Sequence, residues 1–274
     1  MRGSEPPSDT GRVPQASRGA SWAGGRLRLS VLEWLSLPLL VVIWHILAIA
    51  MSSRFLPTPL AVASEITELA ISGNLLADFA KTLTRASIGF VVAMAVGLAL
   101  GLVLGRLRPV DRLFGPWVVV GLNLPAIVVA IACYIWLGLT EFALILAVVI
   151  NKVPLVTTTI REGVRSLAPE FDELADAFRL STGHRLRVIY VPQLIPFVLA
   201  AARTGISLIW KIVLVFEVLG SDGGVGFRVS VFFQFFDIKG VLAYTIVFIL
   251  VVVAIEYLVL RPLESRFLRW RDTP

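Results

Sequence analysis

The sequence predicts an all-α, polytopic membrane protein with about six transmembrane helices. Of its 274 residues, 57% are hydrophobic and 16% are charged, and the mean hydropathy is +0.85. A soluble domain of this size carries more charge. Several uncharged runs also reach the roughly 20 residues that a helix needs to cross the hydrocarbon core. We therefore interpret the net charge of +6 as a topology signal and not as affinity for nucleic acid.

The chain begins with a segment that has no apolar period. Residues 1–30 are rich in Gly, Ser, Pro and Arg, which predicts a flexible, cytoplasmic N-terminal tail. The first apolar run, residues 31–51, has nearly the length of a full span. Ala48-Ile49-Ala50 also fits a signal-peptidase site, so a cleaved signal is the alternative, although the tail is long for the start of a signal. We expect a transmembrane domain over residues 31–274.

A rigid break separates the first span from a short helix. Residues 55–59 read Phe-Leu-Pro-Thr-Pro, and prolines fix the backbone and remove hydrogen-bond donors. After the break, residues 61–71 have the period of an amphipathic helix with Glu65 and Glu68 on its polar side. Gly73-Asn74 is typical of a helix end.

The second span, residues 82–105, carries a small residue at every fourth position. Residues four apart lie on one face of a helix, so these form a single stripe. A stripe of small residues lets another helix approach closely in a membrane. The sequence therefore predicts a tight helix–helix contact along Gly89, Ala93, Gly97, Gly101 and Gly105.

The next two spans each contain a proline. Residues 113–140 carry no charge, and Asn123-Leu124-Pro125 lies inside them, where proline is expected to kink a helix. The following span, residues 142–160, is interrupted at Asn151-Lys152-Val153-Pro154. Asn123 and Asn151 are candidates for lining a path through the membrane, and helix packing accounts for them equally well.

Two more spans complete the six, residues 195–216 and 241–260, with a glycine-rich turn at residues 220–226 between them. An even number of spans puts both termini on one side. With the termini inside, 17 of the 25 Lys and Arg residues lie inside, five lie outside and three fall within spans. By the positive-inside rule, both termini and the loop at about residues 161–195 are expected in the cytoplasm.

This loop contains one short amphipathic helix, predicted over residues 169–182. Pro169 and three acidic residues suit its first turn, and Gly183 is expected to stop it. Its apolar side chains follow helical spacing in one stripe, namely Phe171, Leu174, Ala175 and Phe178. The stripe fits a protein groove or the bilayer surface, and the acidic first turn favours the groove because anionic lipid repels it.

The loop resembles that of the membrane subunits of ABC importers, which carry E-A-A followed by I-x-L-P. Here Glu173-Leu174-Ala175 and Ile189-Tyr190-Val191-Pro192 stand at those positions, at the expected spacing. The chain looks most similar to the nitrate/sulfonate/taurine branch of these permeases, over roughly residues 55–270. Further matching pieces are Leu56-Pro57-Thr58-Pro59, Leu83-x-Arg85-x-x-x-Gly89-Phe90, Trp136-Leu137-Gly138-Leu139-x-Glu141, Gly163-Val164-Arg165-Ser166, and Glu217 ahead of Gly220-Ser221-x-Gly223-Gly224-x-Gly226.

The resemblance implies that the loop is a coupling helix that docks to an ATPase. The residues it implies for this contact are Phe171, Glu173, Leu174, Ala175, Phe178, Arg179 and Gly183. The chain departs from the family pattern at one of them, because the glycine expected six residues after Glu173 is Arg179. We expect a straighter or longer first helix, or a pivot moved by about one turn to Gly183. A membrane unit that pairs two different permeases would tolerate this change best.

The same resemblance implies the permease subunit of an ATP-driven importer in the bacterial cytoplasmic (inner) membrane. Its implied partners are a cytoplasmic ATPase dimer, a second permease copy or paralogue, an extracytoplasmic solute-binding protein and membrane lipid. The sequence has no phosphate-binding G-x-x-x-x-G-K-[ST] motif. We therefore expect no cofactor and no catalysis on this chain, with ATP and Mg²⁺ bound by the partner ATPase.

Two lysines fall inside predicted spans, Lys152 and Lys211. Ionisable groups there are costly and tend to face a cavity or a partner. One interpretation is a cationic lining for a small anionic solute, such as a sulfonate or carboxylate. The alternative is pairing with Glu217 or Glu256, or extension of the ammonium to the membrane surface.

Two other functional classes compete with the importer. A polytopic membrane enzyme needs clustered His, Asp or Glu side chains, and the two histidines, His45 and His184, lie in separate segments. The single cysteine, Cys133, excludes an intrachain disulfide and a cysteine-based metal cluster, and no metal site is expected. The second alternative is a membrane scaffold or regulatory paralogue with a vestigial coupling loop.

Overall fold

The computed structural model describes residues 22–167, 170–260 and 262, which contain helices and no strands. The chain divides into two units, residues 1–52 and residues 53–274. The first unit contains α1 (Trp22–Met51). α1 therefore overlaps residues 22–30 of the predicted tail, where Arg26-Leu27-Arg28-Leu29 are strong helix formers. The rest of that tail lies outside the described residues.

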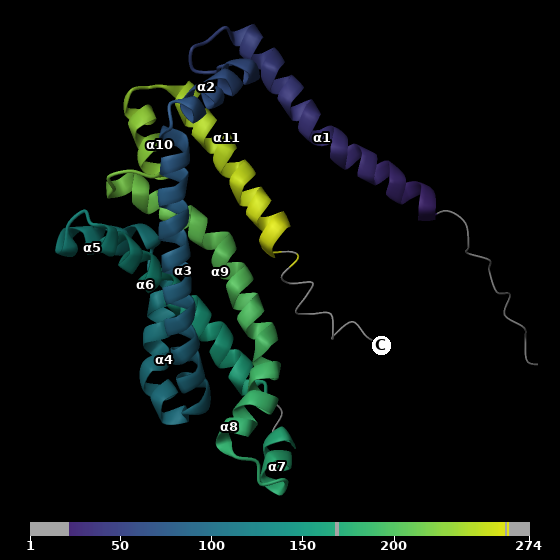
Figure 1. The fold of residues 1–274 in the computed structure, drawn as a ribbon, viewed down its shortest axis with the longest axis vertical. Coiled ribbons are helices and arrows are strands. Elements are labelled where there is room, and N and C mark those ends of the chain that lie inside the picture. The colour runs from purple at the N-terminus through teal and green to yellow at the C-terminus, as the bar shows by residue number, and fades with distance from the viewer. Residues whose placement is uncertain (1–21, 168–169, 261, 263–274) are drawn as a thin grey trace, which may run out of the picture. The chain divides into compact units, whose positions relative to one another are not determined.

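The second unit is built around four helices long and apolar enough to cross a membrane (Figure 1). They are α3 (Asn74–Arg106), α6 (Glu141–Arg165), α9 (Val191–Gly220) and α11 (Ile238–Ile255). The last of these continues as a π-helical turn, Glu256–Leu260. These four helices correspond to the predicted second, fourth, fifth and sixth spans.

The predicted third span is broken where the sequence places its proline. α4 (Arg108–Asn123) and α5 (Ala126–Leu137) meet at a bend of 98°. Pro125 lacks an N–H and disfavours a helical conformation at Leu124, so the helix ends before it. If the bent pair α4–α5 is counted as one span, the described residues contain five candidate membrane spans. The predicted first span lies in α1, whose described apolar part is Leu35–Met51.

The predicted interruption of the fourth span does not occur. α6 runs unbroken from Glu141 to Arg165 through the segment that contains Pro154. The proline ring is buried and lies against α4, where a Cβ added to Gly121 would stand 2.7 Å from the Pro154 Cγ. Proline is tolerated inside membrane helices where neighbouring groups accommodate the altered backbone.

Two short helices lie at the end of the second unit where α3 begins (Figure 1). α2 (Pro59–Ile71) is capped by Thr58, whose hydroxyl accepts a hydrogen bond from the Ala61 N–H at 3.3 Å. It ends before Gly73, which has the left-handed φ of +82°. The sequence does not reveal α10 (Val225–Gln234), which packs against α9 and α11.

The stripe of small residues on α3 lies directly against α6. A Cβ added to Gly97 would stand 2.5 Å from the Val156 Cβ, and one added to Gly101 would stand 2.6 Å from the Ile160 Cβ. Gly89 and Gly105 meet Val148 and Val164 in the same register. Heavy atoms cannot approach so closely without displacement, so only glycine fits at these crossing points.

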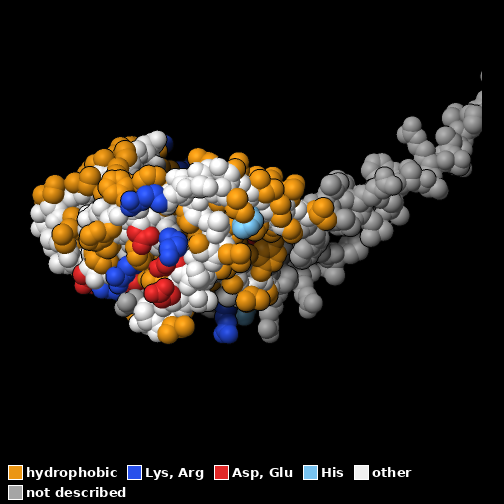
Figure 2. All heavy atoms as spheres, turned by 90° about the horizontal axis from the view of Figure 1, so that it is seen from above, with side chains coloured by type: hydrophobic (Ala, Val, Ile, Leu, Met, Phe, Trp, Pro, Cys, Tyr) orange, Lys and Arg blue, Asp and Glu red, His pale blue; other side chains and the backbone are white. Residues whose placement is uncertain are grey.

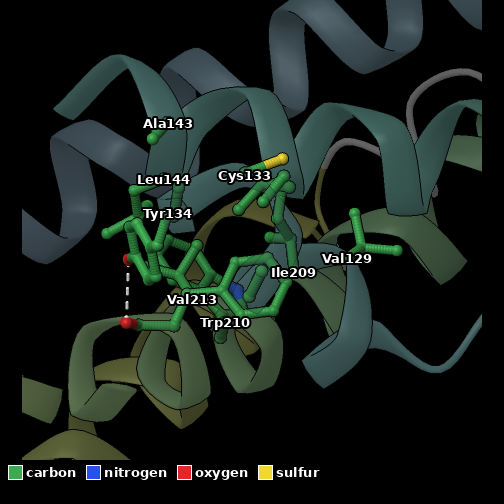
Figure 3. Packing of buried hydrophobic residues seen from close by; sticks show 13 residues of the cluster. Val129, Cys133, Tyr134, Ala143, Leu144, Ile209, Trp210 and Val213 are labelled. Carbon is green, nitrogen blue, oxygen red and sulfur yellow. Dashed lines mark hydrogen bonds between the residues drawn. The ribbon is translucent and has the colours of Figure 1, made fainter. Parts of the chain in front are cut away.

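The core of the second unit lies between α5, α6 and α9. Figure 3 shows Tyr134 of α5 beside Leu144 of α6, together with Cys133 of α5 and with Ile209 and Trp210 of α9. The Tyr134 hydroxyl donates a hydrogen bond to the Phe216 carbonyl at 2.9 Å. A buried tyrosine needs such a partner for its hydroxyl.

Candidate functional site

A charged cluster joins the two helices α3 and α9 at one end of the second unit. Its members are Asp78, Lys81, Thr82, Arg85, Glu141, Glu217, Asp222, Arg228 and Tyr244. Figure 2 looks onto this end and shows acidic and basic side chains lying side by side among hydrophobic ones. The sequence singles out several of these residues as family motifs but does not show that they meet.

Arg85 is the centre of the charged cluster, with 3% of its surface exposed. Its Nε and Nη2 donate to the two carboxylate oxygens of Glu141 at 2.6 Å each. Its Nη1 donates to Glu217 at 2.8 Å and to the Gly223 carbonyl at 2.6 Å. A planar guanidinium suits such a two-pronged contact with a carboxylate.

Glu217 is fully buried, at 0% exposure, and both of its oxygens are occupied. Besides Arg85, it accepts hydrogen bonds from the Thr82 hydroxyl at 2.9 Å and from the Gly226 N–H at 2.9 Å. Burial of a charge is costly unless it is paired and hydrogen-bonded, and here both conditions are met. We therefore assign Glu217 a structural role in joining α9 to α3.

The glycine-rich turn after α9 is shaped by this carboxylate. Gly224 has a φ of +101°, and a Cβ added there would stand 2.3 Å from the Glu217 Oε1. A Cβ on Gly226 would stand 2.4 Å from the Leu214 carbonyl oxygen. The turn therefore needs glycine for both its backbone conformation and its close approach.

The remaining members extend the cluster to α10 and α11. Asp78 accepts hydrogen bonds from the Arg228 Nε at 3.0 Å and from the Tyr244 hydroxyl at 2.8 Å. Lys81 donates to Asp222 at 2.7 Å. This hydrogen bond lowers the pKa of the Asp222 carboxyl below its usual range. Across the described residues, no three His, Cys, Asp or Glu side chains converge as metal ligands would.

Lys152 lies in α6 with 5% of its surface exposed. Its neighbours one turn away, Val148 and Val156, face Gly89 and Gly97 of α3, which places Lys152 on the same helix face. Glu217 pairs instead with Arg85, and Glu256 with Arg203 at 3.8 Å. The predicted pairing of Lys152 with either glutamate is therefore absent among the described residues.

Lys211 lies on the opposite side of its helix from the core and is exposed. Thr204 and Ser207, seven and four residues earlier in α9, are exposed as well. The three side chains form a polar stripe along one face. Asn123 is exposed and donates to the Val119 carbonyl at 2.8 Å, whereas Asn151 is half-buried.

The predicted coupling loop folds as two short helices. α7 (Glu170–Ala177) is followed by α8 (Thr182–Arg185) and a π-helical turn, Leu186–Tyr190. The first helix is thus shorter than predicted over residues 169–182. Phe171, Glu173 and Leu174 lie in α7, and Pro169 lies outside the described residues. Ala175 is buried, and Phe178 is 70% exposed, as an anchor for another protein would be.

Arg179 ends α7 by adopting the left-handed conformation itself, with a φ of +47°. The Arg179 N–H donates to the Asp176 carbonyl at 3.0 Å, and the Leu180 N–H donates to the Ala175 carbonyl at 2.9 Å. These two bonds form a Schellman motif, in which glycine usually holds the left-handed position. The predicted shift of the pivot to Gly183 is therefore wrong, because Gly183 lies inside α8.

Arg179→Gly is expected to stabilise the loop by about 1 kcal/mol, because an L-residue pays about 1–2 kcal/mol in the left-handed region. Slower hydrogen exchange of the α7 amides measures the gain. Arg179→Val is the opposite control, because a β-branched side chain is strained further at this φ. Equal hydrogen-exchange rates in the two variants would contradict the conclusion that the left-handed conformation of residue 179 ends α7.

A family model described as "Binding-protein-dependent transport system inner membrane component" matches residues 93–266. The chain belongs to this family. This match confirms the predicted family and permease function, and the helices of the structure confirm the predicted all-α fold class. The matched residues include α6, α9, α11 and the loop with Arg179, and they exclude the first part of α3.

Several curated proteins resemble the permease over most of its length. The putative aliphatic sulfonates transport permease protein SsuC of Bacillus subtilis (strain 168) is 26% identical over 91% of this chain and 91% of its own. The taurine transport system permease protein TauC of Escherichia coli (strain K12) is 24% identical, covering 93% and 94%. The nitrate import permease protein NrtB of Synechococcus elongatus is 23% identical, covering 79% and 81%.

Solved structures share the fold of the permease at low sequence identity. One, described as an amino acid ABC transporter with histidines, aligns with a TM-score of 0.61 and 16% identity over 73% of this chain and 97% of its own. An inward-facing form of the MetNI methionine ABC transporter aligns with a TM-score of 0.59 and 15% identity over 69% and 95%. At these identities the likeness establishes the fold alone.

Proposed function

We propose that the permease forms the translocation path of an ATP-driven ABC importer for a small anionic solute. It acts with a second permease copy or a paralogue, an ATPase dimer on the cytoplasmic side and an extracytoplasmic solute-binding protein. The chain itself is non-catalytic, and the ATPase binds ATP and Mg²⁺. The family and the three named relatives support this assembly.

The main observation in support of a translocation path is the polar stripe of α9, formed by Thr204, Ser207 and Lys211. The helix belongs to a span of residues 183–220, and the stripe lies on a face that the described helices of the second unit leave exposed. A lysine that faced lipid inside a span would be costly, so such groups face a partner or a water-filled cavity. The stripe therefore lines the path between the two permeases.

The positive charge of Lys211 favours an anion on this path. Sulfonate, taurine and nitrate, which the relatives are named for, all carry an anionic group. Lys152, in α6, is a second cation within a span. It is buried and does not belong to the exposed stripe. Asn123 and Asn151 are further candidates for the lining.

The distribution of basic residues supports an orientation with both termini and the coupling loop in the cytoplasm. α7 and α8 then meet the ATPase, and the exposed Phe178 inserts into its groove. The charged cluster lies at the other end of α3, on the side where the binding protein delivers solute. Movement of the ATPase pair is transmitted to α6 and α9, which flank the loop.

Lys211→Met is expected to lower ATP-driven uptake of a small anion by about 10- to 100-fold, the loss expected for one charge-assisted contact. Uptake of taurine, nitrate and an aliphatic sulfonate is measured in proteoliposomes that contain the assembled importer. Leu208→Met, at an exposed apolar position of the same helix, is the matched control, and Lys211→Arg should retain uptake. Undiminished uptake of all three anions by Lys211→Met would refute the cationic lining.

A further inference from the structure

A basic groove opens at the end of the second unit that carries the loop. Its volume is about 740 Å³, and it lies between the end of α3, the beginning of α4 and the end of α6. Its charged and aromatic lining consists of Arg106, Arg108, Asp111, Arg112, Arg165 and Tyr190. Four guanidinium groups thus face one carboxylate.

Among the described residues that line this groove, Asp111 is the one carboxylate, and it is already neutralised. Asp111 accepts a hydrogen bond from the Arg161 Nη1 at 3.2 Å and a second from Arg165. Arg106 donates to the Tyr190 hydroxyl at 3.0 Å, and its guanidinium lies 4.5 Å from the centre of that ring. These contacts fix the walls of the groove and leave its positive charge uncompensated.

Arg108 and Arg112 supply that uncompensated charge. Both are exposed, and neither forms an ion pair with any residue in the described ranges. They lie four positions apart at the beginning of α4, so their side chains share one helix face. Two adjacent guanidinium forks match the oxygens of a phosphate group.

The groove lies at the boundary between the apolar part of the span and water. The span of α3 ends at Arg106, and α4 then exposes Leu113, Phe114 and Trp117, the last at 73%. The two aromatic rings lie 6.4 Å apart. Exposed tryptophan and apolar side chains next to arginine are typical of the headgroup level of a bilayer. Pro116 and Val119, four and seven residues after Arg112, are exposed on the helix face that carries Arg112, so a ligand held there meets cations and an apolar surface together.

We propose that this groove binds the phosphate of an acidic phospholipid, with Arg108 and Arg112 as its ligands and the exposed face of α4 against its acyl chains. Basic pockets between membrane helices recognise anionic headgroups in this way. A free phosphate ion would use the same guanidinium groups and would make no use of the apolar face. Leu167 and Tyr190, on either side of the coupling loop, also line the groove, so the bound lipid supports the base of that loop.

Lipid binding to the purified full chain is measured by native mass spectrometry, with phosphatidylglycerol and phosphatidylcholine of equal acyl chains. The wild type is expected to bind phosphatidylglycerol about 30-fold more tightly, the gain that two arginines near an anionic group provide. Arg108→Gln combined with Arg112→Gln should abolish this preference. Arg54→Gln, which removes an exposed arginine from another segment, is the matched control and should keep it.

Two further measurements keep the test independent of folding defects. Phosphatidylglycerol should raise the melting temperature of the wild type more than phosphatidylcholine does. The charge-preserving pair Arg108→Lys and Arg112→Lys should retain the preference. The proposal is overturned if the wild type binds both lipids equally, or if Arg54→Gln loses as much as the double variant. Displacement of the lipid by millimolar inorganic phosphate would assign the groove to a free anion instead.

Discussion

Glu217→Gln is expected to lower the free energy of unfolding by about 3–5 kcal/mol, the usual cost of breaking a buried ion pair. The carboxylate is fully buried and accepts hydrogen bonds from Arg85, Thr82 and the Gly226 N–H. An amide removes the negative charge and places an NH₂ donor against groups that are themselves donors. The melting temperature of the purified permease measures the loss, and Glu68→Gln, at an exposed position on α2, is the control.

A double-variant cycle separates the ion pair from simple loss of volume. Arg85→Met and Glu217→Leu each leave one buried charge without its partner, whereas the combined variant removes both charges. The combined loss is therefore expected to be smaller than the sum of the two single losses. Additive losses would show that Arg85 and Glu217 do not act as a pair.

Gly97→Ala is expected to disrupt the α3–α6 interface, with a loss of about 1–3 kcal/mol or more from overpacking. The new Cβ would stand 2.5 Å from the Val156 Cβ and 3.2 Å from the Val153 carbonyl oxygen. Because the contact is with a Cβ and with backbone, no side-chain rotation relieves it. Val92→Leu, on an exposed part of the same helix, is the control. Melting temperature and the yield of folded protein provide the measurement.

A compensating change sharpens this second prediction. Val156→Gly removes the Cβ and the Cγ1 methyl group that the new alanine would strike. Combined with Gly97→Ala, it should restore part of the stability that Gly97→Ala loses, although a glycine in α6 itself costs about 1 kcal/mol. If the combined variant loses as much stability as the sum of the two single losses, the strain caused by Gly97→Ala does not come from its contact with Val156.

The helical fold was predictable because its signals are local. Hydropathy and length identify a span, and the four-residue spacing of Gly97 and its neighbours identifies a close contact. The partner helix was not identified, although Val148, Val156, Ile160 and Val164 of α6 repeat the same spacing. That matching period in a second span is the signal that could have found it.

The charged cluster was not predictable as a unit because its members are distant in sequence. Arg85 and Glu217 are 132 positions apart, and no periodicity relates residues on different helices. A charged residue in each of two spans indicated that partners were needed, but the choice among Arg85, Lys152 and Lys211 depends on how α3, α6 and α9 pack. In the structure, Arg85 pairs with the buried Glu217, whereas Lys211 is exposed.

The loop shows a third limit of prediction from sequence. The missing glycine at position 179 indicated a longer helix or a pivot at Gly183, because arginine is disfavoured in the left-handed region. The backbone keeps the same break and Arg179 adopts the strained φ of +47°. Two capping hydrogen bonds hold it there, so the conformation is set by the helix end and not by the local preference of the residue.

The most direct test of the importer assignment is solute uptake by the assembled complex in proteoliposomes. The permease is reconstituted with an ATPase dimer, a second permease copy or paralogue and a solute-binding protein, and uptake of taurine, nitrate and an aliphatic sulfonate is followed with and without ATP. We predict ATP-dependent accumulation of at least one of these anions, and its loss when this chain is omitted. An ATPase that binds the permease and hydrolyses ATP while no solute enters would contradict the account and identify the chain as a scaffold.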